Sequence, residues 1–327
     1  IISILIVWYG AKEIDFGTLQ VGTLLAFITY TMQIIMSFLM ISLVSVMLPR
    51  ALVSLKRIRE ILKKDISIVE PSNPVAFKES EKGVIEFKNV SFKYPDADEA
   101  MLKNVSFKAT PGTTTAFIGS TGSGKSTLIN LIPRFFDATS GEIYVDGVNI
   151  KEASVIELRN RIGYVPQKGM LFSGTIKSNL MLGNDDLTEE EMQTAAKVSQ
   201  SLEFINAKKD KFDSAISQGG ANVSGGQKQR LSIARAIAKN PEIYIFDDSF
   251  SALDFKTDAA LRKALFKHAK DATVLIVAQR ISTIMNADNI IVLNEGEVVG
   301  SGTHKELLKN CKIYKEIALS QLKEEEL

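Results

Sequence analysis

The sequence has little of several residues that carry common kinds of chemistry. Its 327 residues include one cysteine, one tryptophan and two histidines, and the formal net charge at pH 7 is +1. A single cysteine excludes an internal disulfide framework, and this fits a reducing, cytosolic environment. A net charge this close to zero gives no broad basic face, so the composition predicts no nucleic-acid partner.

Charge is also missing from one long segment near the start of the chain. No Asp, Glu, Lys or Arg occurs from Phe16 to Pro49, and most of these residues are Ile, Leu, Val, Phe or Met. About 20 apolar residues in a helix are enough to cross a bilayer. The segment therefore predicts a full membrane span at about residues 20–49. The alternative is a buried core helix of a soluble protein, but such a helix seldom stays uncharged over this length.

The two flanks of this segment predict its orientation. The residues before it carry no net positive charge, whereas many basic residues follow it: Arg50, Lys56, Arg57, Arg59, Lys63 and Lys64. The positive-inside tendency places this C-terminal end in the cytoplasm, with the span in the inner (plasma) membrane. Residues 1–9 are apolar but too short to span, so we interpret them as the remaining part of a preceding membrane helix in an N-terminally truncated chain.

A phosphate-binding loop is the strongest motif in the rest of the chain. Nine residues fit the pattern G-x-x-x-x-G-K-[ST]: Gly119, Ser120, Thr121, Gly122, Ser123, Gly124, Lys125, Ser126 and Thr127. An apolar, strand-like segment precedes them and a helix-like segment follows, which is the context that this motif requires. The glycines let backbone N–H groups surround a phosphate, while Lys125 reaches the outer phosphates and the Ser126 hydroxyl ligates Mg²⁺. An ordinary Gly/Ser-rich turn would not need this lysine and hydroxyl in register.

Four polar or aromatic residues follow or flank the other predicted strands. Asp247 ends the apolar strand 242–248, where it is expected to hold the Mg²⁺ hydration shell near Ser126. Asp248 stands where a general base or a water-positioning group belongs. Gln167 follows strand 162–165, and its amide oxygen could ligate Mg²⁺ and sense the γ-phosphate, although it could also be a solvated loop residue. Tyr94 could stack on an adenine base or simply pack.

A second phosphate-binding surface is predicted at Ser224, Gly225, Gly226 and Gln227, where a long helix begins. A serine and two glycines at a helix N-terminus favour an anion. One nucleotide does not need two such surfaces from one fold. We therefore expect this surface to face a nucleotide that another domain holds.

The remaining pattern predicts an α/β domain. Capping boxes at Ser154/Glu157, Thr188/Glu191 and Thr303/Glu306 open helices, the second of which is expected to run to about residue 205. A hairpin is expected around residues 294–297, and a last helix is expected to reach the acidic end at 324–326. The predicted organisation is a membrane part over residues 1–65, in which the helix extends past 49 to 65, then a linker over 66–82 and a nucleotide-binding domain over 83–327.

These motifs together resemble the ATP-binding cassette (ABC) family, in its exporter type with a membrane domain fused ahead of the nucleotide-binding domain. The resemblance covers essentially the whole chain. It implies ATP and Mg²⁺ as ligands and a P-loop domain with a mixed-sheet core and a helical subdomain. It also assigns family roles: Tyr94 as the adenine-stacking aromatic, 119–127 as Walker A, Gln167 as the Q-loop glutamine, 224–227 as the signature, Asp247 as the Walker B aspartate and 251–254 as the D-loop.

The resemblance also implies a partner. In this family two nucleotide-binding domains pair head to tail, and each ATP lies between one Walker A loop and the signature of the other domain. The lipid bilayer and a transported small molecule, drug-like or lipid-like, are the other partners implied. The sequence does not identify that molecule.

Four positions depart from the family pattern. Asp248 replaces the usual glutamate, Gln279 replaces the switch histidine, Gln218 replaces a glutamate before the signature, and Val223 replaces its leucine. An aspartate places its carboxylate about 1.5 Å further back than a glutamate, and misplacement of about 1 Å can cost on the order of 100-fold in rate. Glutamine cannot shuttle a proton. Binding should survive while the chemistry is weakened.

This pattern resembles the degenerate-site subunit of a heterodimeric bacterial multidrug exporter. The chain would then be a slow ATPase at its own site, with Asp248, Gln279 and Gln167 in catalytic positions, and its signature would complete the partner's active site. One alternative is a homodimer in which Asp248 is a working base. The other is an ABC ATPase outside transport, such as the DNA-repair type, against which the uncharged segment argues.

Overall fold

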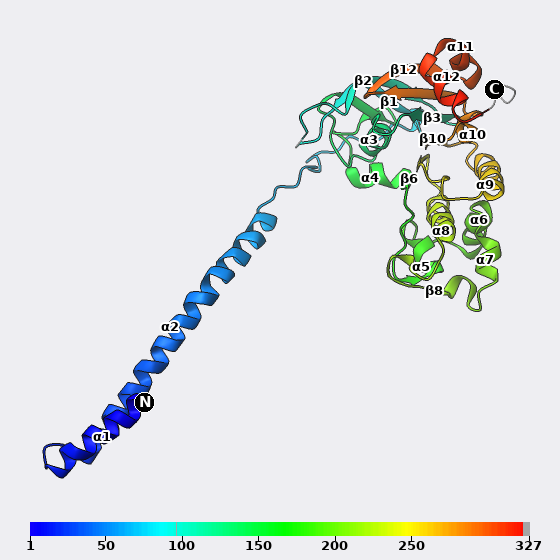
Figure 1. Cartoon of the computed structure of the whole chain (residues 1–327). Coiled ribbons are helices and arrows are strands. Elements are labelled where there is room, and N and C mark those ends of the chain that lie inside the picture. The colour runs from blue at the N-terminus through cyan, green and yellow to red at the C-terminus, as the bar shows by residue number, and fades with distance from the viewer. Residues whose placement is uncertain (96, 323–327) are drawn as a thin grey trace. The chain divides into compact units, whose positions relative to one another are not determined.

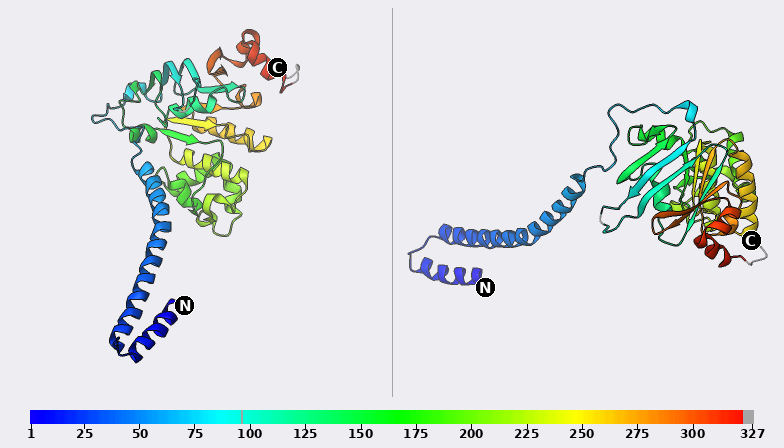
Figure 2. Two further views of the ribbon diagram at one scale, coloured as in Figure 1. Left: turned by 60° about the vertical axis from the view of Figure 1, so that its left-hand side comes forward. Right: turned by 90° about the horizontal axis from the view of Figure 1, so that it is seen from above.

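The computed structural model describes residues 1–95 and 97–322, and the chain divides into two units, Ile1–Ile66 and Ser67–Leu327. The first unit contains two helices, α1 (Ile2–Asp15) and α2 (Val21–Leu62). Gly10 is the buried residue of α1, and a Cβ atom there would lie 2.3 Å from Leu24 Cδ1 of α2. The absence of a side chain at Gly10 therefore lets α1 pack back along α2, as Figures 1 and 2 show.

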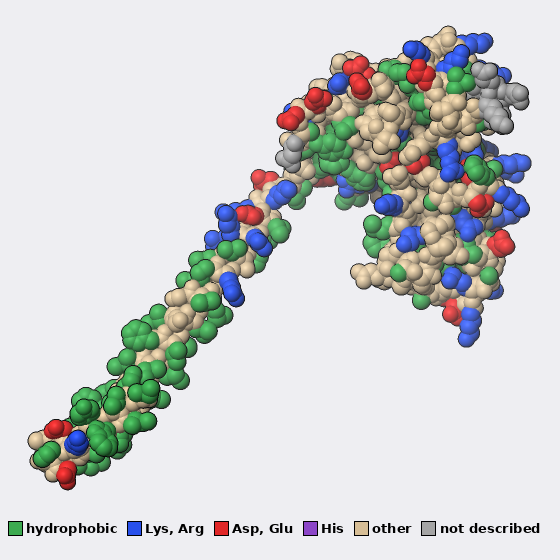
Figure 3. All heavy atoms as spheres, in the orientation of Figure 1, with side chains coloured by type: hydrophobic (Ala, Val, Ile, Leu, Met, Phe, Trp, Pro, Cys, Tyr) green, Lys and Arg blue, Asp and Glu red, His purple; other side chains and the backbone are tan. Residues whose placement is uncertain are grey.

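Helix α2 has 42 residues and none of them is buried. Figure 3 shows hydrophobic side chains over most of its length, with Lys and Arg gathered at its C-terminal end. Four of its hydroxyls are satisfied within the helix: Thr29, Thr31, Ser37 and Ser45 each donate to the carbonyl four residues before. Among the described helices it alone is long and apolar enough to cross a membrane. Helix α1 continues to Asp15, past the predicted segment 1–9. Helix α2 continues through Pro49 and ends at Leu62, three residues before the predicted end of the extension at 65.

The second unit is built on a six-stranded sheet in the order β12-β11-β3-β10-β9-β6. Its strands are β3 (Thr114–Gly119), β6 (Ile162–Val165), β9 (Ile243–Asp247), β10 (Thr273–Val277), β11 (Asn289–Asn294) and β12 (Glu297–Gly302). Five strands run parallel and β12 is antiparallel at one edge. The predicted hairpin around residues 294–297 is confirmed. The C-terminal ends of the five parallel strands lie at the same end of the sheet, so the loops that follow these strands meet there.

A second, antiparallel sheet has the order β2-β1-β4-β5. Its strands are β1 (Ile85–Phe92), β2 (Leu102–Ala109), β4 (Ser140–Val145) and β5 (Val148–Asn149). Helix α3 (Lys125–Leu131) lies between the sheets, since its Leu128 and Ile129 share one buried cluster with Phe87 of β1 and Phe117 of β3. Residues next to Phe117 face the other way and join a second cluster with the helices. Successive side chains of β3 therefore point to opposite faces of the sheet, and both faces are buried.

The helices complete the domain. Figures 1 and 2 show α5 to α8 grouped beside one end of the sheets. The bounds are α4 (Val155–Asn160), α5 (Ile176–Met181), α6 (Glu189–Val198), α7 (Leu202–Asn206), α8 (Gly225–Ala238), α9 (Phe255–His268), α10 (Ile281–Ile284), α11 (His304–Asn310) and α12 (Lys312–Leu319). Short 3₁₀ turns lie at 79–81, 211–213 and 218–220, and β7 (Gly174–Thr175) pairs with β8 (Ala215–Ile216). The predicted α/β class with a mixed-sheet core, a helical subdomain and a preceding apolar helix is confirmed.

Three local expectations need correction. Helix α4 begins after Ser154, but the Ser154/Glu157 box does not form, because the Glu70 carboxylate accepts from the Val155 amide at 3.1 Å and takes the capping role. The helix expected from 188 to about 205 is two helices, since Gln200 adopts a φ of 58° between them. The last helix ends at Leu319, and residues 324–326 lie outside the described part of the chain.

Candidate nucleotide-binding site

The phosphate loop joins β3 to α3, as the sequence pattern predicts. Gly122 and Gly124 adopt left-handed φ values of 83° and 97°, which side chains disfavour. A Cβ atom at Gly124 would lie 2.7 Å from Leu102 Cδ2 and 3.0 Å from the Met101 carbonyl oxygen. The close approach of β2 therefore requires glycine there. The loop ends in the first turn of α3, whose free N–H groups favour an anion.

Lys125 lies inside the loop and is only 8% exposed. Its Nζ donates to the carbonyls of Gly119 at 2.9 Å and Ser120 at 2.7 Å. Burial lowers the pKa of the Lys125 amine, and the charges of Asp248 and Asp247 oppose this shift. The ammonium is thus the buried cation of the loop, beside two carboxylates, and it is held by carbonyls that a phosphate could replace.

Ser126 and Asp247 form the site suited to a magnesium ion. Ser126 Oγ donates to Asp247 Oδ1 at 2.8 Å, although 121 residues separate them. Burial raises the pKa of Asp247, with the Asp248 charge adding to the effect. A hydroxyl and a carboxylate are hard oxygen donors that fit Mg²⁺. No group of three His, Cys, Asp or Glu side chains that could hold a metal ion occurs among residues 1–95 and 97–322. A Mg²⁺ ion here would take further ligands from phosphate, water or the predicted Gln167 amide.

Three predicted residues meet around one carboxylate oxygen. Asp248 Oδ2 accepts from Gln279 Nε2 at 3.0 Å and from Gln167 Nε2 at 3.2 Å. Gln279 follows β10, Asp248 follows β9 and Gln167 follows β6. These three strands are neighbours in the sheet, and their C-terminal ends lie side by side. Asp248 itself has a left-handed φ of 46°, a conformation that aspartate tolerates better than most residues. Its backbone is fixed by the bond from its N–H to the Val277 carbonyl, 2.9 Å long.

One cleft collects the phosphate loop and these side chains. The described residues that line it are Met101, Thr121, Gly122, Gly124, Lys125, Ser126, Thr127, Gln167, Asp247, Asp248, Val277 and Gln279. Met101 was not predicted, because only the pairing of β1 with β2 brings it here. The signature residues 224–227 are not among these lining residues. Ser224 instead caps α8, accepting from the Gln227 amide at 3.2 Å while Gln227 Oε1 accepts from the Ser224 amide.

Tyr94 lies beside the phosphate loop. Its hydroxyl and Thr127 Oγ1 are 3.1 Å apart. Its ring packs edge-on against Phe92 and Phe136, with centroids 4.7 Å and 5.3 Å away. The position next to the loop agrees with the predicted contact to a base, and that role stays a prediction.

The loop of Gln167 is held by residues that the sequence did not single out. Gln229 of α8 accepts from the Gly169 amide at 2.7 Å and donates to the Pro166 carbonyl at 3.2 Å. Arg235, one and a half turns further along α8, donates to the Met170 carbonyl. The helix that begins at the signature is thereby connected to the loop that reaches the cleft. No local pattern predicts this, because the contacts join residues 60 to 65 positions apart.

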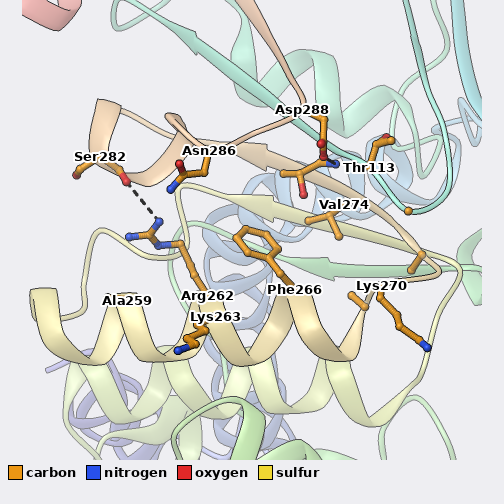
Figure 4. A pocket seen from close by; sticks show the side chains of 14 residues that line it. Thr113, Ala259, Arg262, Lys263, Phe266, Lys270, Val274, Ser282, Asn286 and Asp288 are labelled. Carbon is orange, nitrogen blue, oxygen red and sulfur yellow. Dashed lines mark hydrogen bonds between the residues drawn. The ribbon is translucent and has the colours of Figure 1, made fainter. Parts of the chain in front are cut away.

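A larger pocket lies at the opposite end of the sheet, beside the N-terminal ends of β3 and β10 (Figure 4). Phe266 and Arg262 of α9 line it together with Asn286 and Asp288. Its volume is about 540 Å³ against about 290 Å³ for the cleft. The Arg262 guanidinium is already paired with the Asp258 carboxylate at 2.9 Å. The smaller cleft agrees with the predicted nucleotide site, since it has the glycine loop, the lysine and the carboxyl ends of the strands.

Fold and cleft together define a P-loop nucleotide-binding domain of α/β type. Comparison with known families narrows this class: the profile described as "ABC transporter" matches residues 102–251. The chain therefore contains an ABC transporter ATP-binding domain. Domains of this family are ATPases that use ATP with Mg²⁺.

The relatives are exporter-like. An uncharacterised ABC transporter ATP-binding protein of Mycobacterium tuberculosis is 45% identical over 98% of this chain and 55% of its own length. A Staphylococcus aureus protein, provisionally named a multidrug export ATP-binding/permease protein, is 40% identical over 96% of this chain and 54% of its own. A solved bacterial Atm1-family ABC exporter with ATP bound matches with a TM-score of 0.79 and 32% identity, over 98% of this chain and 56% of that one. The chain thus spans about half the length of these relatives.

Proposed function

We propose that this chain is the ATP-binding part of an ABC exporter subunit whose own ATP site is degenerate. Residues 1–65 then form the C-terminal part of a transmembrane domain, and residues 83–327 form the cytoplasmic nucleotide-binding domain, joined by the linker 66–82. The basic C-terminal end of α2 supports a cytoplasmic position for that end. The exporter-like relatives support export of a small molecule, drug-like or lipid-like, across the inner membrane.

One contrast supports the proposal: the residues expected to bind MgATP match the family pattern, and those expected to perform hydrolysis depart from it. Lys125, Ser126 and Asp247 are placed for the phosphates and Mg²⁺, with the 2.8 Å bond between Ser126 and Asp247. The general-base position carries Asp248, whose Oδ2 is engaged by two neutral amides at 3.0 and 3.2 Å. Both lone-pair directions of that oxygen are then occupied before any water can donate to it.

The neutral amide of Gln279 also changes the electrostatics of the site. A histidine at this position could carry a positive charge near the γ-phosphate and could pass a proton, but glutamine does neither. Gln279 can only exchange its donor between Asp248 and a phosphate oxygen. We infer slow hydrolysis at this site and long residence of ATP.

The signature surface has a separate role in the proposal. Ser224 and the N-terminus of α8 lie outside the residues lining the cleft. Their groups are suited to a phosphate. In the proposed assembly this surface contacts the ATP of a second, different half-transporter and completes a competent site there. A homodimer, in which Asp248 works as a slower base, is the alternative.

A mixing experiment separates these two assemblies. The chain is measured alone and at 1:1 with a half-transporter that carries glutamate and histidine at the two altered positions. The proposal predicts that MgATP binds to the chain alone with little turnover, and that the mixture turns over at one site. A Ser224→Ala variant should reduce turnover of the mixture without weakening MgATP binding by the chain alone. Fast turnover by the chain alone would support the homodimer instead.

A further inference from the structure

The end of the described chain contacts the residues around Gln279. Gln321 Nε2 donates to the Gln279 carbonyl at 2.8 Å, and the Ile281 amide donates to Gln321 Oε1 at 2.8 Å. We call these two bonds the Gln321 bridge and residues 279–281 the switch segment. One side-chain amide thus pairs with a donor and an acceptor of the same backbone segment, 40 residues away in the chain.

The bridge satisfies the Ile281 N–H, which has no other hydrogen-bond acceptor among residues 1–95 and 97–322. Ile281 is the first residue of α10, where N–H groups lack acceptors within the helix. The N-cap residue, Arg280, makes no side-chain capping bond. Ile281 is fully buried, at 0% exposure, so its amide has little access to water. Gln321 therefore supplies the cap that the local sequence does not.

The position of Gln321 is set by the core. Tyr314 and Ala318 of α12 are fully buried, and Leu322 packs against the same cluster. Tyr314 and Ala318 lie on one face of α12, and the Leu322 amide donates to the Ala318 carbonyl at 2.9 Å just past its end. The Gln321 amide donates to the Ala318 carbonyl at 3.0 Å, so the backbone of Gln321 continues directly from the anchored turn.

A continuous set of contacts then leads from this anchor to the cleft. The Gln321 bridge fixes the backbone on both sides of Arg280, and the Gln279 side chain extends from that backbone to Asp248 Oδ2 at 3.0 Å. We propose that Gln321 is a positioning residue for the ATP site, which sets the switch segment so that the Gln279 amide reaches Asp248. The inference rests on the proposed function of the cleft.

The first test measures the bridge without nucleotide. Amide hydrogen exchange is followed in the full chain in detergent for the native protein, Gln321→Ala and Gln321→Glu. Ser320→Ala is the neighbouring control, since the Ser320 hydroxyl donates to the Ile317 carbonyl and not to the switch segment. Loss of one hydrogen bond corresponds to roughly a 5-fold or greater rise in opening, so exchange at Ile281 should increase by this factor or more in Gln321→Ala. Gln321→Glu should show a smaller increase, because glutamate still accepts from Ile281 but cannot donate to Gln279. The Ala278 amide, bonded to the Phe117 carbonyl, should not change.

The second test asks whether the bridge affects the chemistry. Turnover of MgATP is measured for the same variants by release of labelled phosphate. We expect kcat to rise about 5-fold or more in Gln321→Ala, because the Gln279 amide then no longer occupies Asp248 Oδ2. KM should stay within about two-fold of native, because Gln321 does not contact the phosphate loop. Ser320→Ala should match the native protein in both constants.

The outcomes separate the inference from the proposed function. Unchanged exchange at Ile281 in Gln321→Ala would show that the bridge does not fix the switch segment and would overturn the inference. Faster exchange with unchanged kcat would reduce Gln321 to a structural residue and would overturn its positioning role. A native chain that binds no MgATP would instead refute the proposed function, and the exchange data would still decide whether the bridge exists.

Discussion

Removal of the Lys125 ammonium should weaken MgATP binding by an amount that the structure allows to be worked out. At an effective dielectric constant near 20, a unit charge about 4 Å away contributes about 4 kcal/mol. Lys125 must first give up its bonds to the Gly119 and Ser120 carbonyls, 2.9 and 2.7 Å long, at a net cost of about 0.5–1.5 kcal/mol each. The difference is about 1–3 kcal/mol, so Lys125→Ala should raise the Kd for MgATP roughly 5- to 150-fold.

Isothermal titration calorimetry of the full chain in detergent measures this change. Lys168→Ala is the matched control, since it removes the same charge from an exposed residue next to Gln167 and should change Kd by less than about three-fold. Circular dichroism of the nucleotide-free variants checks that both are folded. A Kd for Lys125→Ala within three-fold of native would refute the assignment of the phosphate loop. If both substitutions raised Kd equally, the loss would follow from removing a positive charge and not from contact of Lys125 with the phosphates.

Two further predictions concern the folded state. Gly124→Ala places a Cβ atom 2.7 Å from Leu102 Cδ2 at a φ of 97°. Urea titration should therefore show a free energy of unfolding lower by about 1–3 kcal/mol, and MgATP binding should weaken. A variant as stable as the native protein would contradict this geometry. Burial lowers the pKa of His304, with the Lys305 charge adding to it, and its Nδ1 lies 2.6 Å from the Tyr314 hydroxyl. Since the unfolded chain then takes up this proton at higher pH than the native protein, stability should fall as pH drops below about 6.5, and His304→Gln should reduce that slope.

The sequence predicted the elements whose signals are local. The strand, glycine loop and helix around Lys125 could be recognised, because each residue type has a separate physical reason to be there. The capping box at Thr188/Glu191 formed as expected, with Glu191 Oε2 accepting from the Thr188 amide at 2.9 Å. The family resemblance singled out Gln167, Asp248 and Gln279, and the parallel strands of the structure bring them together at Asp248 Oδ2.

The interactions that the sequence did not predict join distant segments. Glu70 replaced the expected cap of α4 from 85 residues away, because a carboxylate is a stronger acceptor than a serine hydroxyl. Gln229 contacts the loop of Gln167 in the same way, from 60 residues away. The Gln321 bridge likewise depends on where α12 lies in the fold. Side chains that bond to a remote backbone leave no periodic pattern in the sequence.

In the proposed degenerate site, Asp248 and Gln279 contact each other. The shorter carboxylate is contacted by two neutral amides, and these bonds need no change of protonation state. A glutamate would extend further toward the phosphates, and a histidine could become charged beside it. The account therefore predicts that the site was altered as a unit, with binding retained and hydrolysis reduced.

The most direct measurement is ATP turnover by the native chain, Asp248→Glu, and Asp248→Glu combined with Gln279→His, each at 1:1 with a competent second half. The account predicts one active site in the native pair and a second one in the pair that carries both changes, with a gain at this site of roughly 10- to 100-fold. MgATP affinity should stay within about three-fold, since Lys125 and Asp247 are unchanged. If the native chain alone hydrolyses ATP as fast as the doubly substituted chain, then Asp248 is an adequate base and the proposal of a degenerate site is wrong.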